Sequence, residues 1–150
     1  MTIRALMVDD DLAVCDAVKL FAHEHGIEIE TLQFNVEAWH EYSSNPTIWD
    51  CLILDNVSDP GMRTAELIEK VRNVDGFVGI VAYSGNSRES ENYKGVHFVV
   101  DKSEPIGNLI ESIRESTNMK NDREDISQMT IDLTAIDRSC SRIIAILAVI

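Results

Sequence analysis

Short apolar segments alternate along the chain with longer segments whose apolar residues recur every three or four positions. The apolar segments are IRALMV, IEIETL, CLIL, FVGIVAY and HFVV. The segments of helical period are LAVCDAVKLFAHEHG, VEAWHEYSS, TAELIEKVRN, the polar SRESENYK, and IGNLIESIRES. Continuous apolar runs such as CLIL are typical of strands covered on both faces in a parallel sheet. The alternation therefore predicts a three-layer α/β fold with five strands and five helices.

Polar residues stand at the end of every predicted strand except the second. In open parallel sheets, ligands bind beyond the carboxyl ends of the strands, so these residues are the candidates for chemistry. They are Asp9, Asp10 and Asp11, then Asp55, Ser84 and Lys102. Asp11 is also expected to cap the helix that follows it.

Adjacent carboxylates repel one another unless a cation or protons intervene. Acids from two strands at one edge form an oxygen site of the kind that Mg²⁺ prefers. A lysine and a serine hydroxyl beside them can bind phosphoryl oxygens. The set suits an aspartyl phosphate, with Asp55 as nucleophile, magnesium as the neutralising ion, and Lys102 and Ser84 as contacts of the product.

These residues resemble the motifs of the receiver domain of two-component response regulators, over residues 1–117. The motifs are VDD with Asp9 and Asp10, DCLILD with Asp55, IVAYSG with Ser84, and FVVDKS with Lys102. The resemblance implies a flavodoxin-like, doubly wound sheet of strand order 2-1-3-4-5. It also implies a phosphoacceptor signalling domain rather than an enzyme, limited to self-catalysed phosphotransfer and dephosphorylation.

The resemblance further implies roles for individual residues and partners. Asp55 accepts the phosphoryl group from a sensor histidine kinase or phosphotransfer protein. Magnesium is bound directly by Asp10, largely through water by Asp9, and by Asp55 and the backbone carbonyl of Val57.

Three positions depart from the family pattern. Pro60 stands one place later than expected in the loop after the acceptor. Ser103 replaces the proline that often follows the lysine, so a cis peptide is not expected there. Val99 takes a position that is often aromatic, and the neighbouring Phe98 points to the opposite face of its strand. Coupling is therefore expected to run through Ser84 and the fourth helix, or to be weak.

Residues 118–150 form a linker and a predicted amphipathic helix. Apolar residues recur at spacings of three and four, as in a coiled coil: Ile126, Met129, Leu133, Ile136, Cys140, Ile143, Leu147 and Ile150. This seam predicts a homodimer through residues 122–150. The alternatives are a helix that folds back on its own domain and a bundle of more than two helices. An output domain or partner is expected beyond Ile150.

The net charge, the length of the apolar runs and the cysteine spacing indicate which partners and which cellular compartment to expect. The 150 residues carry a formal net charge of −13, which argues against binding of nucleic acid by this chain. No apolar run is long enough to cross a bilayer and no signal peptide is evident, so a cytoplasmic protein without membrane contact is expected. Cys15, Cys51 and Cys140 do not have metal-ligand spacing and are expected to be reduced thiols.

Two other functions fit parts of the pattern. Asp9, Asp10 and Asp11 also match the Asp-x-Asp opening of haloacid-dehalogenase-type magnesium phosphatases, although Asp55 precedes Ser84 and Lys102 in the wrong order for that family. A phosphorylation-independent pseudo-receiver, kept for dimerisation, would explain the altered loop after Asp55 and the missing aromatic residue.

Overall fold

The computed structural model describes the backbone of residues 1–149 and the side chains of residues 1–129 apart from Ser87. Its backbone divides into two compact units, residues 1–120 and 121–150. In the described part, no helix has an apolar stretch long enough to span a membrane.

Five parallel strands form one sheet in the first unit, in the order β2-β1-β3-β4-β5. The strands are β1 (Ile3–Val8), β2 (Ile27–Leu32), β3 (Cys51–Leu54), β4 (Gly79–Ser84) and β5 (Phe98–Asp101). The helices are α1 (Leu12–Glu24), α2 (Asn35–Ser44), α3 (Thr64–Val74), α4 (Ser87–Ser90) and α5 (Ile106–Val149), with a 3-10 turn at Pro46–Ile48. The predicted doubly wound fold and its strand order are confirmed.

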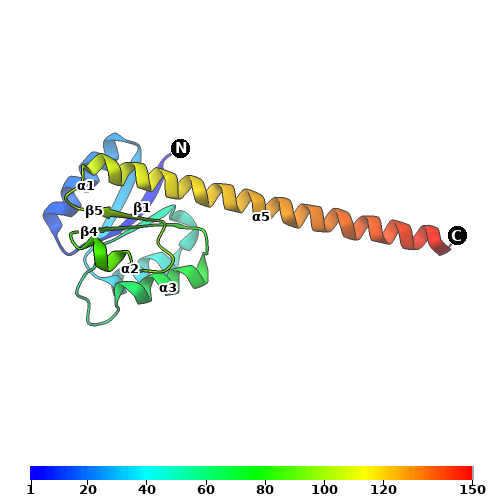
Figure 1. The fold of residues 1–150 in the computed structure, drawn as a ribbon, viewed down its shortest axis with the longest axis horizontal. Coiled ribbons are helices and arrows are strands. Elements are labelled where there is room, and N and C mark those ends of the chain that lie inside the picture. The colour runs from blue at the N-terminus through cyan, green and yellow to red at the C-terminus, as the bar shows by residue number, and fades with distance from the viewer. Residues whose placement is uncertain (150) are drawn as a thin grey trace. The chain divides into compact units, whose positions relative to one another are not determined.

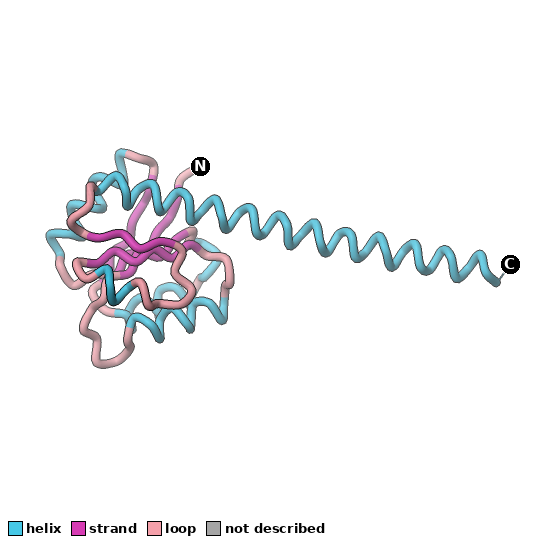
Figure 2. The backbone as a smooth tube through the Cα atoms, viewed as in Figure 1, coloured by secondary structure: helices cyan, strands magenta, loops and turns pink. Residues whose placement is uncertain are grey.

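Two apolar cores cover the two faces of the sheet, because successive strand residues point to opposite sides. In β3, Cys51 and Ile53 pack with α1 and the start of α5, whereas Leu52 and Leu54 pack with α2 and α3. Figure 1 shows the helices on the two sides, and Figure 2 shows the strands in magenta between them. Since β3 and β4 are buried along their whole length, polar groups that follow them lie at the strand ends.

The fourth helix is shorter than the sequence predicts. The segment SRESENYK was expected to be helical, but α4 covers only Ser87–Ser90 and is a short cyan stretch between two loops in Figure 2. The Asn92 side chain donates to the carbonyl of Arg88, at 3.2 Å. Gly95 has φ +87°, a left-handed conformation that glycine adopts without strain. The chain therefore leaves the helix early and turns towards β5.

The helix α5 is continuous through residues 118–121, where the sequence predicts a linker. Within the first unit it stays packed as far as Lys120, which is buried. The Lys120 ammonium donates to the carbonyl of Trp49 at 3.4 Å and lies 4.0 Å from a carboxylate oxygen of Asp75. Ser116 packs at the start of β4, where a Cβ added to Gly79 would lie 2.5 Å from its hydroxyl oxygen.

Candidate functional site

The site is built where β1 and β3 end side by side. Val8 and Leu54 are paired in the sheet, and each is followed directly by an acid. The Asp9 amide donates to the carbonyl of Leu32 at 3.0 Å, and the Asp55 amide donates to that of Val8 at 3.0 Å. Because these bonds extend the ladder by one residue, the two acids are held at the same edge of the sheet.

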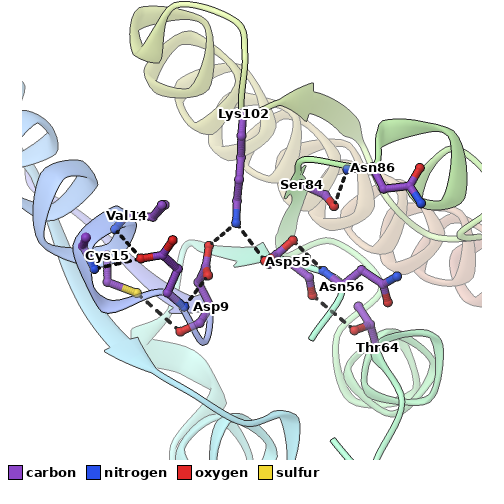
Figure 3. Close-up of polar contacts among 11 residues, drawn as sticks. Asp9, Val14, Cys15, Asp55, Asn56, Thr64, Ser84, Asn86 and Lys102 are labelled. Atoms are coloured by element: carbon purple, nitrogen blue, oxygen red, sulfur yellow. Dashed lines mark hydrogen bonds and ion pairs between the residues drawn. The ribbon is translucent and has the colours of Figure 1, made fainter. Parts of the chain in front are cut away.

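Lys102 joins the two acids. Its Nζ lies 2.7 Å from Asp9 Oδ2 and 2.8 Å from Asp55 Oδ2 (Figure 3). The Lys102 amide donates to the carbonyl of Ser84 at 3.1 Å, which places the lysine directly after the paired ends of β4 and β5. Its Nζ also lies 5.9 Å from the centre of the Tyr83 ring, within cation–π range. Residues from three strand ends therefore meet at one point.

Three carboxylates form an acidic cluster beside this lysine. One oxygen each of Asp9, Asp10 and Asp55 lies within 4.8 Å of the others. Asp9 is fully buried, Asp55 is partly buried and Asp10 is exposed to solvent. Hard oxygen ligands of which one faces water suit Mg²⁺, which keeps several of its own waters. The donor set thus fits the implied ion.

Burial and charge act in opposite directions in this cluster. Burial raises the pKa of Asp9 above its ordinary 3.8, although the hydrogen bond from Lys102 acts to lower it. Burial also disfavours the Lys102 ammonium, but its hydrogen bonds with Asp55 and Asp9 outweigh this and raise the lysine pKa. The ammonium therefore stays charged at neutral pH, next to a buried acid that carries a desolvation cost.

The loop after β1 orders the start of α1. Asp9 Oδ1 accepts from the Asp11 amide at 2.9 Å. Asp11 Oδ1 accepts from the amides of Ala13 at 3.0 Å and Val14 at 3.3 Å, which confirms its predicted role as helix cap. Cys15 is buried and its thiol lies 3.5 Å from the Asp9 carbonyl oxygen. Burial raises the pKa of this thiol to about 11, so it is not a thiolate at neutral pH.

The loop after β3, which holds the displaced Pro60, is attached to α2. Asp59 Oδ2 accepts from the Val36 amide at 3.0 Å, and its Oδ1 accepts from the Gly61 amide at 2.7 Å. The buried Asn35 side chain donates to the carbonyl of Met62 at 3.0 Å. These bonds fix the loop despite its unusual sequence.

Two residues, Asn56 of this loop and Thr64 at the start of α3, contact Asp55 and were not singled out by the sequence analysis. The Asn56 amide donates to Asp55 Oδ1 at 2.8 Å, and the Thr64 hydroxyl donates to the Asp55 carbonyl at 3.2 Å (Figure 3). The phenol of Tyr93, from the segment after α4, donates to Asn56 Oδ1 at 2.8 Å. Asn56 follows Asp55 directly in the sequence, so its neighbourhood to the site follows from its position. Tyr93 is 37 residues away from it, and no local pattern marks it.

The other predicted residues lie at or near the site. Ser84 ends β4 with a buried side chain, and its Oγ accepts from the Asn86 amide at 3.1 Å. Val57 lies two residues after Asp55, with its side chain in the core on the α2 and α3 face. Its carbonyl as a metal ligand stays a prediction. The described residues contain no cis peptide bond, including at Ser103.

The arrangement can be compared with known structures. The response regulator protein TrrA of Thermotoga maritima, solved in complex with Mg²⁺ and BeF, is 25% identical, with a TM-score of 0.68 over 77% of this chain and 99% of that one. A CheY-like receiver domain of Methanospirillum hungatei is 24% identical, with a TM-score of 0.70 over 82% of this chain and 99% of that one. The chain has the receiver fold of response regulators.

A curated protein also matches part of the chain. It is the uncharacterized transcriptional regulatory protein YclJ of Bacillus subtilis, 26% identical over 98 residues, or 65% of this chain. The match spans 41% of the length of YclJ. No protein-family model matches the chain.

Proposed function

We propose that this chain is a response-regulator receiver module that accepts a phosphoryl group on Asp55. The observation that carries the proposal is the contact of one ammonium, that of Lys102, with carboxylates from two adjacent strand ends, at 2.7 and 2.8 Å. A salt bridge for stability alone needs one carboxylate. Two carboxylates at a buried edge of the sheet repel each other, which costs folding free energy. A phosphoryl-transfer site needs both of them to bind its metal ion, which explains why they are kept together.

The proposed step transfers a phosphoryl group from a nitrogen or oxygen atom of the donor to a carboxylate oxygen of Asp55. A carboxylate oxygen of Asp55 attacks the phosphorus of a phosphohistidine or a small acyl phosphate. The new P–O bond forms as the bond from phosphorus to the donor's leaving atom breaks, and the leaving group keeps that electron pair. Lys102 and the Ser84 hydroxyl bind the phosphoryl oxygens, because both can donate hydrogen bonds to an anion.

Magnesium fits this site and supplies neutralisation of the charge that gathers on the phosphoryl oxygens. The ion would be held by Asp9, Asp10, Asp55 and the backbone carbonyl of Val57. The neighbour TrrA, which was solved with Mg²⁺ and BeF, supports this assignment. The chain's own contribution is to keep the acids together and Lys102 charged.

Intact-mass spectrometry tests the assignment. The native chain is incubated with Mg²⁺ and a small acyl phosphate, beside Asp55→Asn and the control Asp16→Asn, an exposed acid on α1. We expect the native chain and Asp16→Asn to gain one phosphoryl group and Asp55→Asn to gain none. Absence of the gain in the native chain would instead support a phosphorylation-independent dimerisation module. A gain that persists in Asp55→Asn would place the acceptor elsewhere.

Residues 122–150 are proposed to join two chains and to pass the state of Asp55 to an output. Ile126 and Met129, the first two seam residues, are each 63% exposed. The seam positions from Leu133 onward lie outside the described side chains. The similarity to a transcriptional regulatory protein, of which the chain spans 41%, supports an output domain or partner elsewhere. We also propose that a sensor histidine kinase is the phosphodonor and that the protein is cytoplasmic. This chain is not expected to bind nucleic acid.

A further inference from the structure

The segment between α4 and β5, residues 91–97, is held at both ends. At its start, the Asn92 amide donates to the carbonyl of Glu89 at 3.3 Å, and the Tyr93 amide donates to that of Ser90 at 3.1 Å. At its far end, the Gly95 carbonyl accepts from Arg72 Nε at 3.0 Å and Nη2 at 2.7 Å.

Arg72 fixes this far end to the body of the domain. Its Nη1 donates to the Val78 carbonyl at 2.7 Å, at the entry to β4. A Cβ on Gly95 would lie 3.2 Å from Arg72 Cγ, so the backbone approaches the arginine closely. The Tyr93 side chain, between the two anchors, is the part of the segment that reaches towards the site.

Tyr93 is tied to Asn56, which contacts Asp55. Its Oη donates to Asn56 Oδ1 at 2.8 Å. The backbone amide of Asn56 donates to Asp55 Oδ1 at 2.8 Å. Asn56 therefore bridges the carboxylate of Asp55 and the phenol of Tyr93, with one hydrogen bond to each.

The ring of Tyr93 is placed between the core and the surface. It is partly buried against the apolar core on the α2 and α3 face. It also lines a pocket of about 590 Å³ with residues of α3 that include Glu69 and Arg72, and with Asn92, Lys94 and Gly95. A shift of the ring therefore changes the shape of a surface pocket.

We propose that Tyr93 is the residue through which segment 91–97 responds to the phosphorylation state of Asp55, in place of an aromatic residue at Val99. The inference rests on the proposed function, because it requires Asp55 to be phosphorylated. Tyr93 acts through Asn56 and is a positioning residue, not a catalytic one.

Phosphorylation changes what Asn56 can bind. The phosphoryl group brings a charge of about −1.5 to −2 and three strong acceptor oxygens next to the Asn56 amide. These oxygens compete with Asp55 Oδ1 for that amide, and any rotation of the Asn56 peptide displaces the Oδ1 that holds Tyr93. Burial raises the pKa of Tyr93, so the phenol remains a donor at neutral pH.

Hydrogen–deuterium exchange of residues 88–97, with intact mass measured on the same samples, tests the inference. The full chain is compared with Tyr93→Phe, which keeps the ring and removes the hydroxyl, and with the control Tyr42→Phe, whose hydroxyl is in the core on the same face. Each protein is measured in Mg²⁺ with and without a small acyl phosphate.

We expect the native chain and Tyr42→Phe to gain a phosphoryl group and to change their exchange in residues 88–97 by at least about twofold. Tyr93→Phe should gain the phosphoryl group as fully, while its exchange in this segment no longer depends on the phosphodonor. An undiminished change in Tyr93→Phe, or no change in a fully phosphorylated native chain, overturns the inference and leaves the proposed function intact. A native chain that gains no mass overturns the proposed function and this inference with it.

Discussion

Asp59 caps a helix to which it does not belong: its Oδ2 accepts from the amide of Val36, in the first turn of α2, at 3.0 Å. The residue before α2, Phe34, has no side chain that could do this. The loop that follows Asp55 therefore supplies an anion to a helix N-terminus, where backbone amides and the helix dipole favour one. The loop and α2 stabilise each other.

This cap predicts how stability depends on pH on the acid side. Hydrogen bonds from the amides of Val36 and Gly61 lower the pKa of Asp59 below 3.8. The unfolded chain therefore takes up the proton first, so this contribution is present above about pH 4 and is lost as the pH falls through the folded pKa. Urea unfolding from pH 5 to 3 should show a steeper loss of stability in the native chain than in Asp59→Asn. Equal slopes would mean that the cap makes no pH-dependent contribution.

Replacement of Lys102 should lower the free energy of unfolding, because the two acids beside it then repel each other without a neutralising cation. In Lys102→Ala, the buried Asp9 and its neighbour Asp55 lose their shared cation, and we expect a loss of about 1–3 kcal/mol in the free energy of unfolding at neutral pH. Millimolar Mg²⁺ should restore more stability to this variant than to the native chain, since it replaces the missing positive charge. Urea titrations with and without MgCl₂ measure both effects. A variant as stable as the native chain would show that desolvation of the ammonium cancels its attraction to the acids.

Magnesium should stabilise the native fold by mass action. At a concentration 100 times its dissociation constant, one bound ion adds about 2.7 kcal/mol to the free energy of unfolding. Asp10→Asn removes an exposed ligand of the acidic cluster and should lose most of this gain, while Asp16→Asn should keep it. NaCl at the same ionic strength controls for screening. Equal stabilisation by MgCl₂ and NaCl would exclude a specific site.

Two glycine substitutions should have opposite signs. In Gly79→Ala the new methyl group meets the Ser116 hydroxyl at 2.5 Å and the backbone oxygen of Asp50 at 3.1 Å, so we expect a loss of about 1–3 kcal/mol. In Gly107→Ala, at the start of α5, nothing lies within 4 Å of the new Cβ, and the higher helix propensity of alanine should add up to about 1 kcal/mol. Thermal unfolding distinguishes the two. A neutral Gly79→Ala would mean that α5 can move away from the sheet.

The proposed dimer can be tested with two substitutions at neighbouring positions that add the same charge. Met129→Glu places a carboxylate in the predicted seam, whereas Gln128→Glu places it one position outside. Burial of an ionised group in an apolar seam is costly, so Met129→Glu should weaken self-association at least about tenfold. Light scattering over a concentration series measures the dimer. Equal effects of the two variants would favour a helix that does not self-associate through this seam.

Sequence patterns were sufficient for the fold because the central strands β3 and β4 are covered on both faces. Short continuous apolar runs such as CLIL are typical of buried strands in a parallel sheet. The carboxyl ends of parallel strands lie at one edge of the sheet, so the polar residues that follow them meet there. Asp9, Asp55 and Lys102 were predicted on this basis, and the structure brings them together.

The remaining features depend on contacts between residues that are distant in the sequence. The short α4 results from Asn92 and from Gly95, whose backbone lies against Arg72. The segment around Asn92 and Gly95 is polar and has no regular spacing of apolar residues, so the sequence pattern does not show where α4 ends. Tyr93 reaches Asn56, and Asp59 caps α2, only because the tertiary fold brings separate loops together.

The burial of Lys120 has a practical consequence for protein engineering. A chimera that joins a foreign effector after Thr117 would discard the ammonium that bonds to the Trp49 carbonyl. A splice beyond Lys120 would retain this contact, and altered behaviour of the chimera could then be attributed to the new effector rather than to a damaged receiver fold.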